Sequence, residues 1–292
     1  MIGRSIVVGV DGSDEASDAA ALGNRLAIGA GGALHCVLAV SDPIADVAAA
    51  RLSIDADQLH EELVAEKRRK VAERLSRVLG ERKAAETLTA RLGRPEHVLA
   101  EIGREVDADL FVIGGRRSPA GRPRLRRGTA RHLMRTGEAP VLLTGPAGPH
   151  VDRVLAAVDL SFAAPPILRV ATELASLLGV RLEGLHVSTL PSMPGEWKPA
   201  LDASAVLEAS AERAERLLWS SLPEGATGAT VPGAAVPEIL RVAGQVPHTL
   251  LVLGAQGHGW VHRLLLGSTA ESLLDALPCS LAMIPVRPSP DG

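Results

Sequence analysis

The chain has 292 residues, of which 46% are hydrophobic and 22% charged, with a formal net charge of −3; these values are ordinary for a soluble globular protein. Aromatic residues make up only 2% of the sequence, which argues against aromatic-lined sugar sites and base-stacking nucleic-acid platforms. The small net charge gives no overall attraction to DNA or to anionic lipid.

Alternating strands and helices are predicted along the first half of the chain. An apolar strand over residues 6–10 is followed by a helix of small residues from about Asp14 to Ala30, which ends at the pair Gly31-Gly32. Further apolar and amphipathic runs predict the other elements of this half, namely a strand over 33–40, a long helix with apolar residues from 59 to 78 on one face, a strand near 87–92, a helix opening at Pro95, a strand over 110–113, a helix from Thr129 and a strand over 141–144. The second half repeats this order and has its own long helix from about 203 to 222.

The order of the elements repeats because the sequence itself repeats. SIVVGVDGS, which ends at Ser13, matches RVLAAVDLS, which ends at Ser161, and later segments match in the same order, such as DLFVIGG with TLLVLGA. A Gly/Pro segment over 145–149 separates the copies and is typical of a linker. We therefore predict two related domains, 1–146 and 151–286, followed by a tail over 287–292.

Near-continuous apolar strands separated by helices are typical of a parallel sheet that is covered on both faces. With right-handed crossovers, each half becomes a doubly wound α/β domain of the flavodoxin- or Rossmann-like kind, with a five-stranded parallel sheet and helices on both faces. A ligand site is expected at the carboxyl ends of the strands, where the winding direction reverses.

The loop after the fourth strand of the second half carries the most informative motif, Gly254-x2-Gly257-x9-Gly267-Ser268. Glycines let backbone N–H groups approach a phosphate without interference from a Cβ atom. Gly267-Ser268 would open a helix whose free N–H groups and dipole favour negative charge. The alternative is purely structural, because Ser268 and Glu271 have the spacing of a capping box and glycines between strand and helix are often only turns.

This spacing resembles the nucleotide-binding signature of the universal stress protein family, and the resemblance runs over nearly the whole chain. It includes VGVDGS and VDLS after the first strands, LHV over 185–187, GRPEHVLAEI over 93–102, and DLFVIGG. Two such domains resemble the tandem, ATP-binding members of the family, in which Mg²⁺ can accompany the nucleotide. The resemblance implies that the acid after the first strand lies near the adenosine, that a valine of the second strand neighbours the base through its backbone, and that the glycine motif surrounds the phosphates. The residues implied in the second half are Asp159, Val187, Gly254, Gly257, Gly267 and Ser268.

The first half departs from the family pattern. The positions that the resemblance implies there are Asp11, Gly115, Gly128 and Thr129. Counting back from Gly128 reaches Gly115 but puts Ser118 where the second glycine belongs, whereas starting at Gly114 needs an insertion of one residue and puts Arg117 there. Nucleotide binding by the first half is therefore left open.

The same loop of the first half is rich in arginine. A guanidinium group can donate two parallel hydrogen bonds to the oxygens of one phosphate. The cluster could therefore replace the lost glycine contacts or bind a polyanion. The alternative is a solvated basic loop. Because the cluster is local and its domain as a whole is not basic, nucleic acid is not expected as a partner. The cluster consists of Arg116, Arg117, Arg122, Arg124, Arg126, Arg127 and Arg131.

The cysteines and the apolar segments indicate the cellular location. Cys36 and Cys279 lie far apart with no CxxC motif or Cys/His cluster, so neither a disulfide framework nor a structural zinc site is expected. His258 and His262 have i,i+4 spacing but no HExxH motif, and we interpret them as solvent or phosphate neighbours. The N-terminal apolar run is too short for a signal peptide, and the longest uncharged stretch, 242–262, is too polar to span a membrane. We expect a cytoplasmic protein with no metal site and no membrane partner.

No catalytic residue is assigned. The sequence lacks a P-loop, a GxGxxG after either first strand, and GxSxG. The resemblance implies an ATP-binding stress-response or regulatory protein that acts through nucleotide-dependent conformation or through binding of a protein partner that the sequence does not identify. The alternatives are a nucleotide-free scaffold that acts by protein association and, third, a slow ATP hydrolase. Two fused domains supply a pseudo-dimer within one chain, and a homodimer of chains is also compatible.

Overall fold

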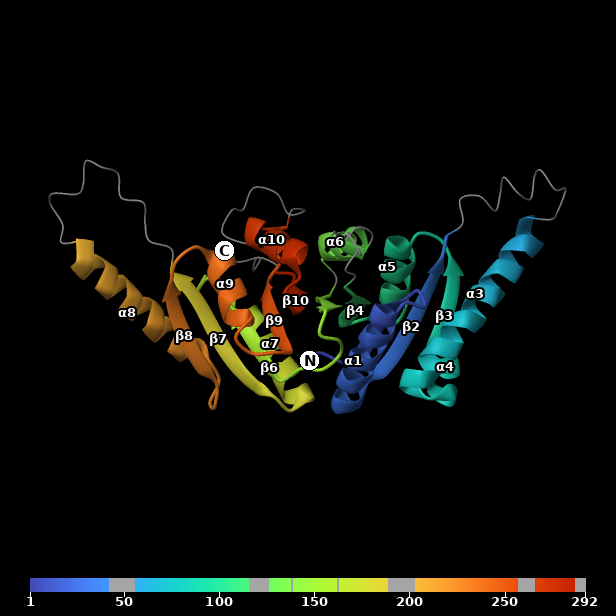
Figure 1. The fold of residues 1–292 in the computed structure, drawn as a ribbon, viewed down its shortest axis with the longest axis horizontal. Coiled ribbons are helices and arrows are strands. Elements are labelled where there is room, and N and C mark those ends of the chain that lie inside the picture. Colours follow the sequence, from blue (N-terminus) through green and yellow to red (C-terminus); the bar gives the residue numbers. More distant parts are fainter. Residues whose placement is uncertain are drawn as a thin grey trace. The chain divides into compact units, whose positions relative to one another are not determined.

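The computed structural model divides the chain into two compact units, Met1–His150 and Val151–Gly292. Each unit is an α/β domain that contains parallel strands and helices (Figure 1). The described residues are 1–41, 56–115, 126–137, 139–161, 163–188, 203–256 and 266–286.

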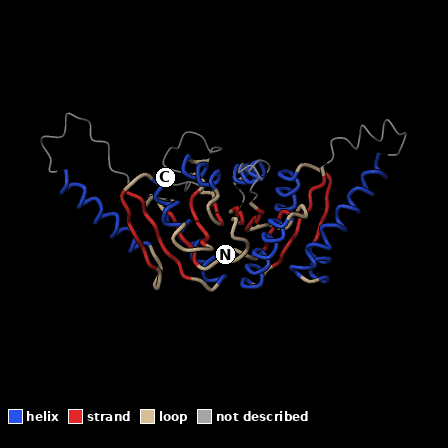
Figure 2. Tube along the Cα trace, viewed as in Figure 1, coloured by secondary structure: helices blue, strands red, loops and turns tan. Residues whose placement is uncertain are grey.

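Strands and helices alternate along the first domain. Its elements are, in order, β1 (Ser5–Val10), α1 (Asp14–Ala30), β2 (Ala33–Val40), α3 (Ala56–Leu79), α4 (Glu81–Thr87), β3 (Leu88–Leu92), α5 (Pro95–Glu105), β4 (Leu110–Gly114), α6 (Arg126–Thr136) and β5 (Val141–Thr144). The strands pair in parallel in the order β3-β2-β1-β4-β5. Helices α1 and α3 pack on each other, and α5 packs on α6, so that the sheet lies between two helical layers (Figure 2).

The second domain has the same architecture. Its elements are β6 (Arg153–Ala157), α7 (Ala164–Leu178), β7 (Arg181–Ser188), α8 (Ala203–Ser221), β8 (Thr227–Pro232), α9 (Ala235–Ala243), β9 (Thr249–Gly254), α10 (Ser268–Ala276) and β10 (Ser280–Ile284). The order β8-β7-β6-β9-β10 is again entirely parallel, and α7 packs on α8 while α9 packs on α10. In each domain the winding therefore reverses beside the first strand, between β1 and β4 and between β6 and β9.

Aliphatic strands buried on both faces build the core of each domain. Every residue of β4, β5, β6 and β10 is buried, which is typical of parallel strands between two helical layers. Phe111 of β4 is the largest of the fully buried side chains. A Cβ atom at Gly103 would lie only 2.4 Å from Cζ of Phe111, so the absent side chain lets α5 pack directly on this ring.

Local signals explain where the helices begin and end. Ser13 caps α1, because its Oγ accepts a hydrogen bond of 3.1 Å from the N–H of Ala16. The helix ends at Gly31, whose φ of +61° is left-handed, and Gly179 ends α7 in the same way with a φ of +68°. Glycine adopts this conformation without a steric penalty.

The fold agrees with the predicted α/β architecture, and the bounds of α1 and β2 agree with the sequence prediction. The strand order is the Rossmann order rather than the flavodoxin order. The short helix α4 was not predicted, and α6 begins at Arg126 instead of Thr129. Val78, predicted on the apolar face of the long helix, is 39% exposed. None of the helices in the described part of the chain is long and apolar enough to cross a membrane.

Candidate functional site

The second domain contains a cavity of about 350 Å³ at the carboxyl ends of β6, β7 and β9. This is the point where the strand order reverses, which is the usual ligand position in open parallel sheets. Its volume lies within the range of small-molecule sites. The wall combines strand ends with the first turns of α7, α9 and α10.

The structure brings together five of the six residues singled out in the second half. All of them line this one cavity, although they come from four separate segments of the chain; they are Asp159, Val187, Gly254, Gly267 and Ser268. The sixth, Gly257, lies outside the described residues, as do His258 and His262. The neighbouring Gln256 also lines the cavity.

Two backbone hydrogen bonds hold the ends of the glycine motif side by side. The N–H of Ala255 donates to the carbonyl of Ile284 at 2.8 Å, which extends the pairing of β9 with β10 by one residue. The carbonyl of Ala255 in turn accepts a bond of 2.8 Å from the N–H of Gly267. The end of β9 and the start of α10 therefore meet at the cavity, whatever the path of the loop between them.

The first turn of α10 presents backbone donors to the cavity. Gly267 is the N-cap residue, and the first intrahelical bond runs from the N–H of Glu271 to the carbonyl of Gly267 at 2.9 Å. The N–H groups of residues 268–270 precede this bond and have no partner within the helix, and all three residues line the cavity. Ser268 is exposed and is the first helical residue rather than the cap, so the capping box suggested by its spacing from Glu271 does not form.

Asp159 follows β6 in a tight, hydrogen-bonded turn. Its Oδ1 accepts bonds from the backbone N–H of Ser161 at 3.0 Å and from the Ser161 hydroxyl at 2.6 Å. Between them, Leu160 has a φ of +57°, a left-handed conformation that is strained for any residue with a Cβ atom. The turn holds the carboxylate at the cavity wall.

Sequence reasoning missed His186 and the apolar wall of the cavity. The ring Nδ1 of His186 lies 2.9 Å from the carbonyl of Val158, and His186 lines the cavity together with Ile167 of α7 and Ile239 of α9. These residues are far apart in the sequence, and only the pairing of β6 with β7 and the helix packing bring them together. The LHV segment was a local signal for the strand, but it did not indicate the role of its histidine.

In the first domain, strand pairing corrects one assigned residue. Gly114 pairs with Thr144 on β5 as Gly254 pairs with Ile284 on β10, so Gly114, and not Gly115, is the equivalent of Gly254. Gly115 instead corresponds to Ala255, and its N–H donates to the carbonyl of Thr144 at 3.0 Å. The count from Gly128 was misleading because α6 already begins at Arg126, so Gly128 lies inside the helix and is not the counterpart of Gly267, the N-cap of α10.

The other positions assigned in the first domain also differ from their counterparts. Gly128 and Thr129 lie inside the first turn of α6 and not at its start, and Thr129 is only 8% exposed. Asp11 repeats the turn of Asp159, since its Oδ1 accepts from the N–H of Ser13 at 2.9 Å, and Gly12 takes the left-handed position with a φ of +80°. Residues 116–125, with most of the arginine cluster, lie outside the described residues.

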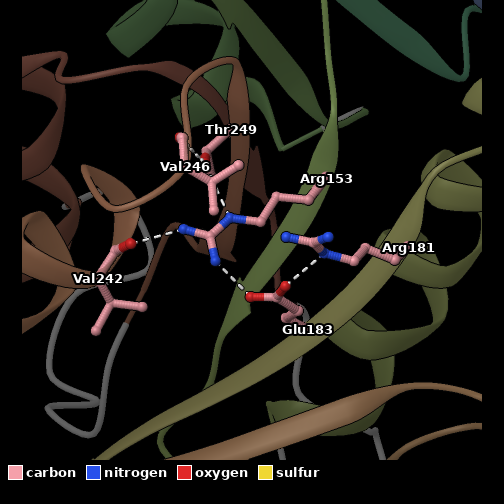
Figure 3. Close-up of polar contacts among 6 residues, drawn as sticks. All are labelled: Arg153, Arg181, Glu183, Val242, Val246 and Thr249. Atoms are coloured by element: carbon pink, nitrogen blue, oxygen red, sulfur yellow. Dashed lines mark hydrogen bonds and ion pairs between the residues drawn. The ribbon is translucent and has the colours of Figure 1, made fainter.

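A buried ionic network occupies the opposite, amino-terminal edge of the second sheet (Figure 3). Arg153, the first residue of β6, is 3% exposed and pairs with Glu183 of β7. Its Nε donates to the hydroxyl of Thr249 at 3.0 Å, and its Nη2 donates to the carbonyl of Val242 at 2.6 Å. Arg181 contacts the other carboxylate oxygen of Glu183 at 2.7 Å. The network joins three strands and α9, and we assign it a structural role.

The described residues offer neither a metal site nor a reactive thiol. No group of three or more His, Cys, Asp and Glu side chains among them is arranged to hold a metal ion. Cys36 and Cys279 are free and buried, and burial raises the pKa of each thiol to about 11. Both thiols are therefore protonated and unreactive at neutral pH.

Comparison with known proteins identifies the two domains. The sequence profile of the universal stress protein family matches residues 3–145 and, a second time, residues 150–285. No curated protein sequence matches the chain. Among solved structures, a universal stress protein from Archaeoglobus fulgidus DSM 4304 is 19% identical and has a TM-score of 0.63 over 98% of this chain and 99% of its own. A functionally unknown protein from Pseudomonas aeruginosa PAO1 is 20% identical, with a TM-score of 0.64 over 97% of this chain and 92% of its own. At these identities the structures show that the fold is shared.

Proposed function

We propose that this chain, which belongs to the universal stress protein family, binds ATP in the cavity of its second domain. On this proposal it is a stress-response protein that acts through nucleotide-dependent conformation or partner binding. The observation that carries the proposal is the meeting of Asp159, Val187, Gly254, Gly267 and Ser268 around one cavity at the switch point of the sheet.

Backbone donors at one end of the cavity favour the phosphates. The N–H groups of residues 268–270 lack partners within the helix, and the dipole of α10 adds positive potential at the same place. Gly254 keeps the cavity wall free of a side chain: a Cβ atom there would lie 3.0 Å from Cδ1 of Ile167 and 3.3 Å from the carbonyl oxygen of Gln256, two residues that also line the cavity. Mg²⁺ would arrive with the nucleotide and keep most of its water ligands, since it needs few protein ligands when phosphates supply the rest.

Aliphatic side chains in the wall of the same cavity favour the base. Ile167, Leu185 and Ile239 face the cavity from α7, β7 and α9 and can hold a flat ring between them without aromatic stacking. Asp159 supplies hydrogen-bond acceptors for the ribose or for an exocyclic amine. A carboxylate at this position also disfavours a phosphate here by charge repulsion, so it orients the nucleotide with its phosphates toward α10.

The test is direct analysis of nucleotide content and of thermal stability. Protein purified without added nucleotide is extracted with base, and adenine nucleotides are separated by chromatography; stripped protein is then melted with and without millimolar ATP. A ligand at 100 times its Kd stabilises the native state by about 2.7 kcal/mol, so we expect a clear upward shift of Tm. Gly254→Val should remove the shift in Tm, because its branched side chain would crowd the cavity wall at Ile167 and Gln256.

The matched control is Gly128→Ala in the first domain, where a Cβ atom meets nothing within 4 Å; it should leave the shift intact. The absence of both extracted nucleotide and thermal shift would contradict the proposal and favour a nucleotide-free scaffold. Sustained ATP turnover that Gly254→Val abolishes would instead favour the slow hydrolase. The cytoplasmic location belongs to the same proposal, and the two free, buried cysteines are compatible with it.

A further inference from the structure

His186 lines the cavity, and one of its ring nitrogens has no hydrogen-bond partner among the described residues. A backbone carbonyl can only accept, so the contact of 2.9 Å between His186 and Val158 assigns the proton to Nδ1. The neutral ring then carries a lone pair on Nε2. Among the described residues Nε2 has no hydrogen-bond partner, and His186 is one of the residues that line the cavity.

A second unsatisfied polar group lies next to this ring. Thr230 of β8 is paired with His186 in the parallel register, so the two side chains stand on the same face of the sheet. The Oγ1 of Thr230 is buried and has no hydrogen-bond partner among the described residues. Buried hydroxyls without a partner are rare because they lose their bonds to water, and this one lies on the strand next to His186.

The first domain shows that the fold does not require these polar side chains. In its sheet the equivalent register pair is Leu38 with Ala90, on the two strands that correspond to β7 and β8. Leu38 is buried, and the same architecture forms around it. The polar pair in the second domain therefore calls for an explanation other than folding.

We propose that His186 is a specificity-determining residue, whose Nε2 accepts a hydrogen bond from a donor of the bound nucleoside, either the exocyclic amine of the base or a ribose hydroxyl. This inference rests on the proposed nucleotide site, and it adds the residue that recognises a hydrogen-bond donor of the nucleoside. It also explains the difference between the domains, because Leu38 offers no acceptor. A ligand without the donor leaves Nε2 desolvated and unpaired, which is the situation in which hydrogen-bonding sites discriminate most strongly.

Two variants separate recognition from structure. His186→Asn places an amide near the position of Nδ1, so it can keep the bond to the carbonyl of Val158 but has no acceptor at the Nε2 position. His186→Gln places its amide group near Nε2 and can replace the acceptor. We expect His186→Asn to weaken ATP binding about tenfold with the Tm of the unliganded protein unchanged, and His186→Gln to retain most of the affinity. His97→Asn, on the exposed surface of the first domain, is the control and should bind as the parent does.

A panel of nucleotides identifies the donor by isothermal titration calorimetry of the full chain. ATP is compared with purine riboside triphosphate, which lacks the exocyclic amine, and with 2′-deoxy-ATP and 3′-deoxy-ATP. The parent should bind one of the three analogues about tenfold more weakly than ATP, and His186→Asn should remove that difference. Equal affinity of the parent for all four nucleotides, or equal ATP affinity of His186→Asn and parent, would overturn the inference and leave the nucleotide site standing. A parent that binds none of them would overturn the proposed function itself.

Discussion

The N–H of Gly267 donates a hydrogen bond of 2.8 Å to the carbonyl of Ala255, so that α10 begins at the point where β9 ends. This bond joins the first part of the glycine motif to its last part. It directs the first turn of α10 into the cavity, where the N–H groups of residues 268–270 are available to an anion.

The backbone donors of α10 can be tested by removing one of them. Proline is tolerated at the first helical position, where its missing N–H breaks no intrahelical bond. Ser268→Pro should therefore leave the Tm of the unliganded protein nearly unchanged and weaken ATP binding about tenfold in a calorimetric titration. Ser268→Ala removes only the hydroxyl and keeps the backbone N–H. It should therefore weaken ATP binding less than Ser268→Pro. Equal affinities of the proline variant and the parent would show that this N–H does not contact the ligand.

The ionic network of Arg153, Arg181 and Glu183, at the amino-terminal ends of the strands, should contribute to the stability of the second domain and not to ATP binding. Arg153→Met leaves the carbonyl of Val242 and one oxygen of Glu183 without their partner in a buried site, and we expect a loss of about 3 kcal/mol in the free energy of unfolding. All three tryptophans lie in the second half of the sequence, so urea unfolding followed by their fluorescence reports on this domain.

The control for this change is Arg181→Met, which removes the exposed partner of the same carboxylate. Exposed ion pairs contribute about 0–1 kcal/mol, so the two variants should differ clearly in their urea midpoints. Similar midpoints for both would mean that burial of Arg153 does not determine the strength of the network.

The turns after β1 and β6 differ in backbone strain. Gly12→Ala forces a Cβ atom onto a φ of +80° and should destabilise the first domain by about 1 kcal/mol, measured by urea unfolding followed by circular dichroism. Leu160→Gly at a φ of +57° relieves the same strain in the second domain and should not destabilise it. A loss of stability in Leu160→Gly would show that the leucine side chain contributes more by packing than its conformation costs.

The buried thiols make stability fall at alkaline pH. Desolvation raises the pKa of Cys279 in the folded state from 9.0 to about 11, against a smaller opposing contribution from a backbone hydrogen bond. The folded protein therefore keeps this proton between about pH 9 and pH 11 while the unfolded chain loses it. The stabilisation is complete below pH 9 and disappears as the pH rises through 11, by about 2–3 kcal/mol.

Cys279→Ala should remove this part of the pH dependence of the unfolding free energy. The chain contains no tyrosine, so no phenol titrates in the same range. An identical alkaline slope in the variant and the parent would mean that the Cys279 thiol titrates normally in the folded protein.

Local patterns in the sequence were sufficient for the doubly wound architecture. The cap at Ser13 and the left-handed Gly31 determine α1 from its immediate neighbours, and the repeat then carries the same elements to the second half. The glycine motif of the first half was less well predicted: the repeat of DLFVIGG with TLLVLGA aligns Gly114 with Gly254, but counting back from Gly128 selected Gly115, and the pairing of Gly114 with Thr144 decides between the two. The ring of His186 contacts a backbone carbonyl 28 residues away in the chain, and no local sequence pattern predicts such a contact.

The central claim is that the cavity of the second domain binds ATP. Isothermal titration of stripped, full-length chain with ATP measures it most directly, because the number of sites and their affinity come from one experiment. The account predicts an ATP site whose binding is lost in Gly254→Val and retained in Gly128→Ala. No heat of binding at all, or unchanged binding in Gly254→Val, would contradict it.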